Sequence, residues 1–222
     1  MNPVQAAHGG AMPSLWELIA SGGPLMWPLG LCSVIALAFV VERALRLRRA
    51  ALGTELSGKR IVDTLRSSGT AAALELARAE RTPQARVVTA TLEQASASPS
   101  EREKRVEDLA ALETKRLSGN LRPLMIVYVV APLLGLLGTV WGLIEAFATV
   151  ATKNALGRPE LLAAGVYQAL VTTAAGLAIA IPAVVAYYHF KGRIENFARG
   201  LEQLYGEIDP LLVPREVPRA SA

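Results

Sequence analysis

The chain has 222 residues, of which 52% are hydrophobic and only 19% carry a charge, whereas an ordinary globular domain carries roughly 25% charge. Its 23 basic and 19 acidic residues are concentrated in 42–122 and 191–222, and the two long stretches outside these ranges hold almost none of them. This distribution argues against a soluble enzyme of one or two compact domains. Nucleic-acid binding is not expected either, because no basic run is interleaved with aromatic residues.

The N-terminal segment, 1–20, contains a possible helix start and a possible membrane anchor. Ser14 is a suitable N-cap residue, and Trp16 is a residue typical of the membrane–water interface. The segment therefore predicts a short interfacial helix, with a simple lead-in to the following apolar stretch as an equal alternative.

The first apolar stretch predicts a transmembrane helix over 21–42. No ionisable side chain occurs from Leu18 to Val41, and roughly 20 apolar residues are enough to cross the hydrocarbon core. A cleaved signal peptide would need basic residues ahead of its apolar core, and residues 1–41 contain no lysine or arginine. The single cysteine, Cys32, lies inside this stretch, so no intrachain disulfide is possible.

The connection 43–122 predicts helical pairs rather than an enzyme domain. It is rich in alanine, leucine, arginine and glutamate, and its charges alternate in sign as on a solvated helix face. Ser100 followed by Glu103 resembles a capping box that opens a helix reaching about Lys115. A helix that runs on from there into the next span would form a stalk. No nucleotide-binding, zinc-protease or serine-hydrolase motif occurs in this region.

Two further spans follow in the C-terminal half. Residues Pro123 to Ile144 are uncharged, and Leu161 to Phe190 contain no Asp, Glu, Lys or Arg. The expected segments are a second transmembrane helix, an outer loop, a third transmembrane helix and a tail, at 123–148, 149–160, 161–190 and 191–222. The tail is expected to begin as a helix, which ends at three closely spaced prolines, Pro210, Pro214 and Pro218.

Lysine and arginine counts next to the spans predict the orientation of the chain. The ends of the spans that face 43–122 and the C-terminal tail have fourteen basic residues nearby, and the opposite ends have two. Basic residues accumulate on the cytoplasmic side of membrane proteins. The connection and the tail are therefore expected in the cytoplasm, with the N-terminus and the loop 149–160 outside, and the basic isoelectric point follows from topology.

The second and third spans contain small and polar residues at regular spacings. Small residues let a neighbouring helix backbone approach closely in a membrane, and four such positions are expected in helix packing: Gly135, Gly138, Gly142 and Gly176. Polar atoms inside the bilayer must find partners, because lipid offers none. This applies to Gln168, Thr172 and Thr173, which fit helix packing better than an ion path when taken alone.

The strings APLLGLLGTVWGLIEAF and YQALVTTAAGLAIAIPAVV resemble the ExbB/TolQ family, distant relatives of the MotA flagellar stator. The stretch GGPLMWPLGLCSVIALAFVVERALRLRR is also similar to that family's first helix. The resemblance implies an all-α, three-span inner-membrane protein with a helical cytoplasmic domain and a periplasmic N-terminus. It also implies a ring-shaped homopentamer around a single-span partner of the ExbD or TolR kind, driven by protons and acting on a TonB- or TolA-type transducer. No cofactor or metal is expected.

The resemblance also implies roles for single residues. Thr139 and Thr173 fall on the family's pore-facing threonines, and Gln168 falls where many members have a glutamate, which glutamine cannot replace as a proton carrier. Glu145 lies at the outer end of the second span, where it either gates the entrance or is simply solvated. No protonatable side chain occurs in the middle of the spans, so an aspartate of the partner is expected to carry the proton.

Two questions stay open at the level of the sequence. ExbB-like import, TolQ-like envelope maintenance and other surface machines are not separated by these motifs. A membrane scaffold that conducts nothing is the alternative of a different class. An intramembrane protease is excluded, because it would need paired aspartates or a serine with a histidine base within the spans.

Overall fold

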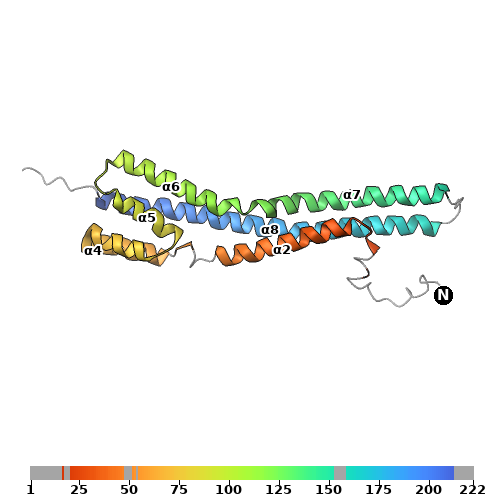
Figure 1. Ribbon diagram of the computed structural model, residues 1–222, viewed down its shortest axis with the longest axis horizontal. Coiled ribbons are helices and arrows are strands. Elements are labelled where there is room, and N and C mark those ends of the chain that lie inside the picture. Colours follow the sequence, from red (N-terminus) through yellow and green to blue (C-terminus); the bar gives the residue numbers. More distant parts are fainter. Residues whose placement is uncertain (1–16, 18–20, 48–51, 54, 153–158, 213–222) are drawn as a thin grey trace, which may run out of the picture. The chain divides into compact units, whose positions relative to one another are not determined.

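The structure is a computed structural model, and it describes residues 17, 21–47, 52–53, 55–152 and 159–212 (Figure 1). All the regular secondary structure of these residues is helical, which confirms the expected all-α fold. The helices are α2 (Met26–Arg46), α4 (Glu55–Ala79), α5 (Pro83–Glu93), α6 (Pro99–Gly119), α7 (Arg122–Thr152) and α8 (Pro159–Leu212). The interfacial helix predicted around Ser14 and Trp16 lies outside the described residues.

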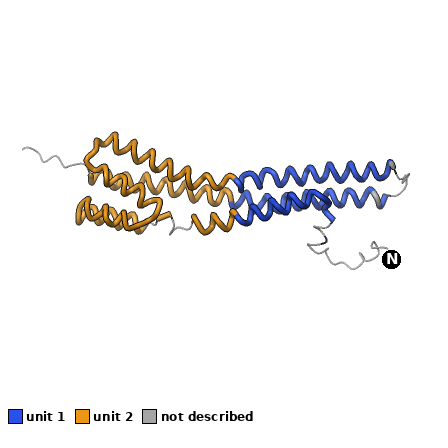
Figure 2. The backbone as a smooth tube through the Cα atoms, in the orientation of Figure 1, with its two compact units in different colours: residues 1–38, 123–186 blue, residues 39–122, 187–222 orange. Residues whose placement is uncertain are grey.

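Among the described residues three helices are long and apolar enough to cross a membrane, and each overlaps one of the three predicted spans. The chain divides into two compact units (Figure 2). The membrane unit comprises 1–38 and 123–186, and the second unit comprises 39–122 and 187–222. Helices α2, α7 and α8 supply the membrane unit, and its buried cluster contains Leu29, Ala131 and Ala180.

The helix of the first span begins at Met26 rather than at the predicted residue 21. Gly23 has φ +71°, in the left-handed region that glycine tolerates, and Pro24 disfavours a helical conformation in the residue before it. Helix α2 packs loosely in the single chain. Only 17% of the most apolar 18-residue stretch of this helix is buried, and the Trp27 side chain is 85% exposed.

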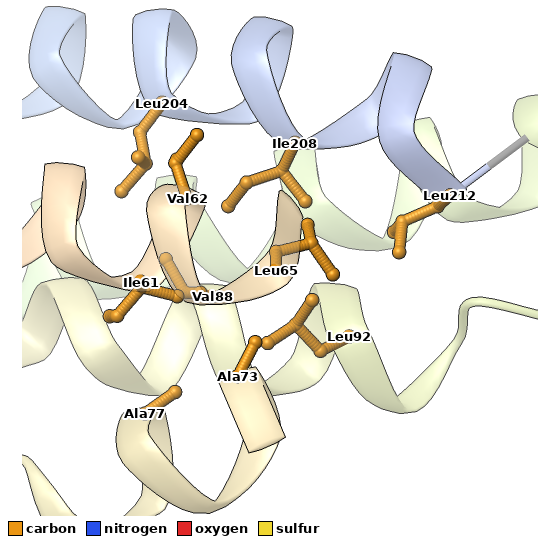
Figure 3. Packing of buried hydrophobic residues seen from close by; sticks show 10 residues of the cluster. All are labelled: Ile61, Val62, Leu65, Ala73, Ala77, Val88, Leu92, Leu204, Ile208 and Leu212. Atoms are coloured by element: carbon orange, nitrogen blue, oxygen red, sulfur yellow. The ribbon is translucent and has the colours of Figure 1, made fainter. Parts of the chain in front are cut away.

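The second unit has a hydrophobic core built by three helices (Figure 3). Helix α4 contributes Ile61, Val62 and Leu65, and α5 contributes Val88 and Leu92. Helix α8 contributes Leu204, Ile208 and Leu212, which recur every four residues and therefore share one face of the helix. Helices α4 and α5 form the first of the expected helical pairs. Within α4, Gly69 has φ +83° and ψ 179°, so the helix is broken at a residue whose missing Cβ permits that conformation.

The capping box of α6 lies two residues before the predicted one. Ser98 is the N-cap: its Oγ accepts from the Glu101 N–H at 3.4 Å, and the Glu101 carboxylate accepts from the Ser98 N–H at 3.3 Å. Pro99 occupies the first helical position, where its fixed φ fits and no N–H is needed. The prediction of a box at Ser100 and Glu103 was wrong. The hydrogen bonds from Ser98 lower the pKa of Glu101.

Two further helix ends can be compared with expectation. Helix α6 ends at Gly119, beyond the expected end near Lys115, and a two-residue turn, 120–121, separates it from α7. The helix of the tail passes Pro210, the first of the three prolines expected to end it, and ends at Leu212, whose side chain is buried in the core with Ile208.

Charged side chains also hold the second unit together, which the alternating charges did not predict. The Arg102 side chain is 2% exposed, and its Nε donates to Asp209 Oδ1 at 2.7 Å, joining α6 to α8. Arg86 of α5 donates two hydrogen bonds to Glu113 of α6, at 3.1 and 2.7 Å, and these lower the pKa of Glu113. Arg43 of α2 is buried and donates to the Leu117 carbonyl at 3.3 Å. These helices therefore do not present all their charges to water.

Candidate functional site

The candidate site lies in the membrane unit, where α7 and α8 pack through small residues. Three close approaches define the contact: Gly176 meets the Ala131 carbonyl, Gly135 meets the Thr172 carbonyl, and Gly142 meets the Gly165 carbonyl. As the residue number increases along α7, the number of the facing residue in α8 decreases, so the two helices are antiparallel. The pairing extends over at least twelve residues of α7.

The two backbones leave little room for a side chain at these glycines, and least at Gly176. An added Cβ would lie 2.6 Å from the Ala131 oxygen at Gly176, and 3.1 Å from the facing carbonyl oxygen at Gly135 and at Gly142. At Gly138 it would collide with the Thr172 side chain. The structure thus places all four predicted packing glycines in the α7–α8 contact, and it adds Gly165, which was not predicted from the sequence.

Three threonine hydroxyls near this contact have different partners. Thr173 Oγ1 donates across the contact to the Gly135 carbonyl at 2.9 Å, and so joins α8 to α7. Thr172 is 1% exposed, and its Oγ1 donates to the Ala169 carbonyl of its own helix at 2.8 Å. Thr139 Oγ1 donates to the Leu136 carbonyl at 2.7 Å, also within its own helix. Of the two threonines implied to line a pore, only Thr173 therefore bridges two helices.

Gln168 lies one turn along α8 from the threonines and contacts the start of α2. The Gln168 amide is so close to Gly23 that a Cβ there would overlap its Nε2 and would lie 3.2 Å from its Cδ. Glycine is therefore required at position 23 for two reasons: the backbone has a positive φ, and the Gln168 amide packs directly against it. This contact was not predicted from the sequence. The Gly22–Gly23–Pro24 string is its only local signal, because Gln168 is remote in sequence.

The Glu145 side chain is exposed, and among the described residues no hydrogen bond joins it to Thr139, Thr172 or Thr173. It lines a shallow cavity of about 380 Å³ with Pro24, Trp141 and Ile144. Its backbone carbonyl accepts from Thr149 Oγ1 at 2.8 Å. Whether Glu145 gates an entrance stays a prediction. Among the described residues no group of three or more His, Cys, Asp or Glu side chains is placed to hold a metal ion.

The hydrogen bonds of Thr173 and Thr139 predict different losses of protein stability when each threonine is replaced by valine. Thr173→Val keeps the side-chain shape but removes the hydrogen bond between α8 and α7, so we expect a loss of about 1 kcal/mol. Thr139→Val removes only a bond within α7, so its stability is expected to change by less than about 0.5 kcal/mol. Denaturation in mixed detergent–SDS micelles, followed by circular dichroism, measures both. Equal losses would contradict the bridging role of Thr173.

Comparison with known proteins identifies the family. A family model described as the MotA/TolQ/ExbB proton channel family matches residues 79–203, more than half of the chain. The chain belongs to the MotA/TolQ/ExbB proton channel family. The match includes both helices of the candidate site and begins at the end of α4, so the first span lies outside it.

Individual relatives point in the same direction. The chain is 34% identical to the biopolymer transport protein exbB1 of Vibrio cholerae over 179 residues, which cover 78% of this chain and 77% of the relative. It is 30% identical to the biopolymer transport protein ExbB of Pseudomonas putida over 202 residues, covering 87% of this chain and 60% of that protein. It is 41% identical to the Tol-Pal system protein TolQ of Pseudomonas aeruginosa over 83 residues, or 37% and 36% of the two chains.

These matches confirm the resemblance seen in the apolar strings of the second and third spans. With three apolar helices and this family membership, the chain is a multi-pass membrane protein. The ExbB proteins of Vibrio cholerae and Pseudomonas putida match over most of the chain, whereas the ExbB of Salmonella typhimurium and the TolQ of Pseudomonas aeruginosa each match over about a third of it.

Proposed function

We propose that the chain is the ExbB-like subunit of a proton-driven motor in the inner membrane. With an ExbD-like single-span partner, it converts the proton motive force into mechanical work on a TonB-type transducer for import across the outer membrane. It performs this work without being an enzyme. Family membership and the biopolymer transport relatives that match most of the chain support this proposal.

The observation that carries the proposal is the chemistry of the polar side chains that α7 and α8 place in the membrane unit. They are hydroxyls and an amide, belonging to Thr139, Thr172, Thr173 and Gln168. These groups order water and solvate a charge, but they neither take up nor release a proton near neutral pH. The sequence of the spans has no central Asp, Glu, Lys, Arg or His. The proton carrier therefore comes from the partner, as an aspartate in its membrane helix.

The driving force for the motor is the proton's passage through the membrane potential. One charge that crosses the potential yields about 2.3 kcal/mol per 100 mV. This is comparable to the cost of rearranging a few side-chain contacts between helices. In our proposal the partner's aspartate is exposed to each side in turn, and each proton shifts the partner helix against the helices of this chain.

We further propose that several copies of the chain form a ring, a homopentamer by the family resemblance, around the partner. The exposed apolar faces of the spans support an assembly. On α7, Leu133 and Leu136 are each 58% exposed, and Trp141 is 54% exposed. Lipid and neighbouring copies are the two surroundings that suit such faces. The excess of basic residues on one side supports a cytoplasmic C-terminus and a periplasmic N-terminus.

Proton flux in liposomes tests the proposal. The purified chain alone is expected to conduct no faster than empty liposomes, because it lacks a protonatable group in the middle of the spans. Adding a single-span partner of the ExbD kind should restore a flux driven by the membrane potential, and an Asp→Asn change in that partner's helix should abolish it. Equal fluxes with and without the partner would refute the assignment of the carrier.

A TolQ-like role in envelope maintenance is the second candidate. The 41% identity to TolQ over 83 residues favours it locally, although the stretch is short. A Tol-like transducer that copurifies with the chain would select this role, and a TonB-like transducer would select import. A scaffold that conducts nothing would show no flux with any partner.

A further inference from the structure

Arg193 of α8 is half-buried, and among the described residues no acceptor or carboxylate is bound to its guanidinium. Two arginines of the described part of the chain are fully buried, Arg43 and Arg102, and each binds at least one acceptor, although one nitrogen of each is left unpaired. The other described arginines without partners are exposed to solvent. A partly desolvated guanidinium is costly without an acceptor, so Arg193 has the features of a residue that binds an anion.

Arg193 lines a pocket of about 850 Å³ in the second unit. His189 and Asn196 also line it and can donate hydrogen bonds, while Tyr188 and Phe197 supply aromatic walls. None of the described residues that line this pocket is acidic. An adjoining pocket of about 450 Å³ shares Asn196 and Phe197, and its lining includes Lys59 and Arg199 but only one acid, Glu207. The pocket therefore suits an anion.

The donor set favours a phosphate group. A guanidinium offers planar, paired N–H groups that match phosphate oxygens. The imidazole of His189 and the amide of Asn196 extend the set of donors along the same helix. Gly192 leaves the pocket open, because no atom lies within 4 Å of the position that its Cβ would take.

The position of the pocket along α8 indicates where the phosphate comes from. The uncharged run of the third span ends at Phe190, and the pocket begins at Tyr188, a residue type that is frequent at membrane interfaces. The pocket thus lies where α8 leaves the uncharged run of the third span, and this is the level at which the phosphate groups of lipids are expected.

We propose that this pocket binds the phosphate group of an anionic phospholipid, with Arg193 as the main ligand and His189 and Asn196 beside it. Basic pockets at the membrane end of a helical protein are suited to anionic lipid headgroups. The lipid belongs to the leaflet at the basic ends of the spans. This function is separate from proton conduction, and it holds whether or not the chain conducts with a partner.

Lipid binding to the full chain tests the proposal. Protein purified in a non-ionic detergent is titrated with phosphatidylglycerol, with phosphatidylcholine and with inorganic phosphate, and bound molecules are counted by native mass spectrometry. Phosphatidylglycerol is expected to bind about tenfold more tightly than phosphatidylcholine. Arg193→Gln should weaken this binding by about tenfold or more, the effect of losing a charge-assisted hydrogen bond. Arg193→Lys should retain part of it.

A pair of glycine variants separates the pocket from general effects on charge or folding. Gly192→Leu fills the pocket without changing charge and should weaken phosphatidylglycerol binding, whereas Gly206→Leu is the control. Gly206 also lies on α8 with no atom within 4 Å of its Cβ position, and it lines neither pocket. Unchanged lipid binding in both Arg193→Gln and Gly192→Leu would overturn the proposal. Inorganic phosphate that competes as strongly as the lipid would overturn the lipid assignment, and equal binding of the two lipids would overturn the preference for anionic headgroups.

Discussion

Gly176→Ala is expected to destabilise the α7–α8 pair by about 1–3 kcal/mol, the usual cost of an extra group in a packed contact. The added Cβ would lie 2.6 Å from the Ala131 oxygen and 3.2 Å from the Gly135 Cα. Both atoms belong to the backbone of α7 and cannot rotate aside, so the helices must separate. The measurement is the SDS mole fraction at the midpoint of denaturation in mixed micelles.

Gly30→Ala is the matched control for this substitution. Gly30 lies in the apolar helix α2, and no atom lies within 4 Å of the position of its Cβ. Alanine favours a helix by up to about 1 kcal/mol over glycine, so this variant should be as stable as the native chain or slightly more so. If both variants lose the same stability, helix packing is not what Gly176 provides.

Asp209→Ala is expected to cost about 3 kcal/mol, because it leaves a buried charge without its counterion. Asp209 Oδ1 accepts from Arg102 Nε at 2.7 Å and from the Tyr205 hydroxyl at 3.1 Å. The Arg102 side chain is only 2% exposed and cannot turn to water without unpacking. The midpoint of urea unfolding in a mild detergent, followed by circular dichroism at 222 nm, measures the loss.

Two variants show whether burial causes this effect. Arg78→Ala breaks an ion pair with Glu93 at a similar distance, 2.8 Å, but both side chains are about half exposed, so its cost should stay below about 1 kcal/mol. The double variant Arg102→Met, Asp209→Leu removes both charges and should regain most of the stability lost in Asp209→Ala. A double variant as unstable as Asp209→Ala would contradict this explanation.

The spans could be predicted from the sequence because a bilayer imposes a simple condition on it. Long runs without charge are needed to cross lipid, and they stand out between segments rich in arginine and glutamate. The packing role of Gly135, Gly138 and Gly142 was predicted from their spacing, and the structure places them against α8. That spacing contains no information about the partner helix, so Gly165 and the bridge from Thr173 became visible only in three dimensions.

The remaining differences arise where local patterns are ambiguous or where contacts are remote in sequence. Ser98 and Ser100 each precede a glutamate by three residues, and Pro99 decides between them because it fits the first helical position. Arg102 and Asp209 are 107 residues apart. Alternating charges on a helix are typical of a solvated face, so nothing local marks Arg102 as buried. The contact of Gln168 with Gly23 is remote in the same way.

The bare apolar faces of the spans also determine what intrinsic fluorescence can report. The chain has three tryptophans, at 16, 27 and 141, and none of them lies in 42–122 or 187–222. Trp27 and Trp141 are largely exposed on apolar helices, so their emission depends on the lipid, detergent or neighbouring subunit that covers them. Tryptophan emission thus reports on the surroundings of the membrane helices, and unfolding of the core of the second unit leaves it almost unchanged.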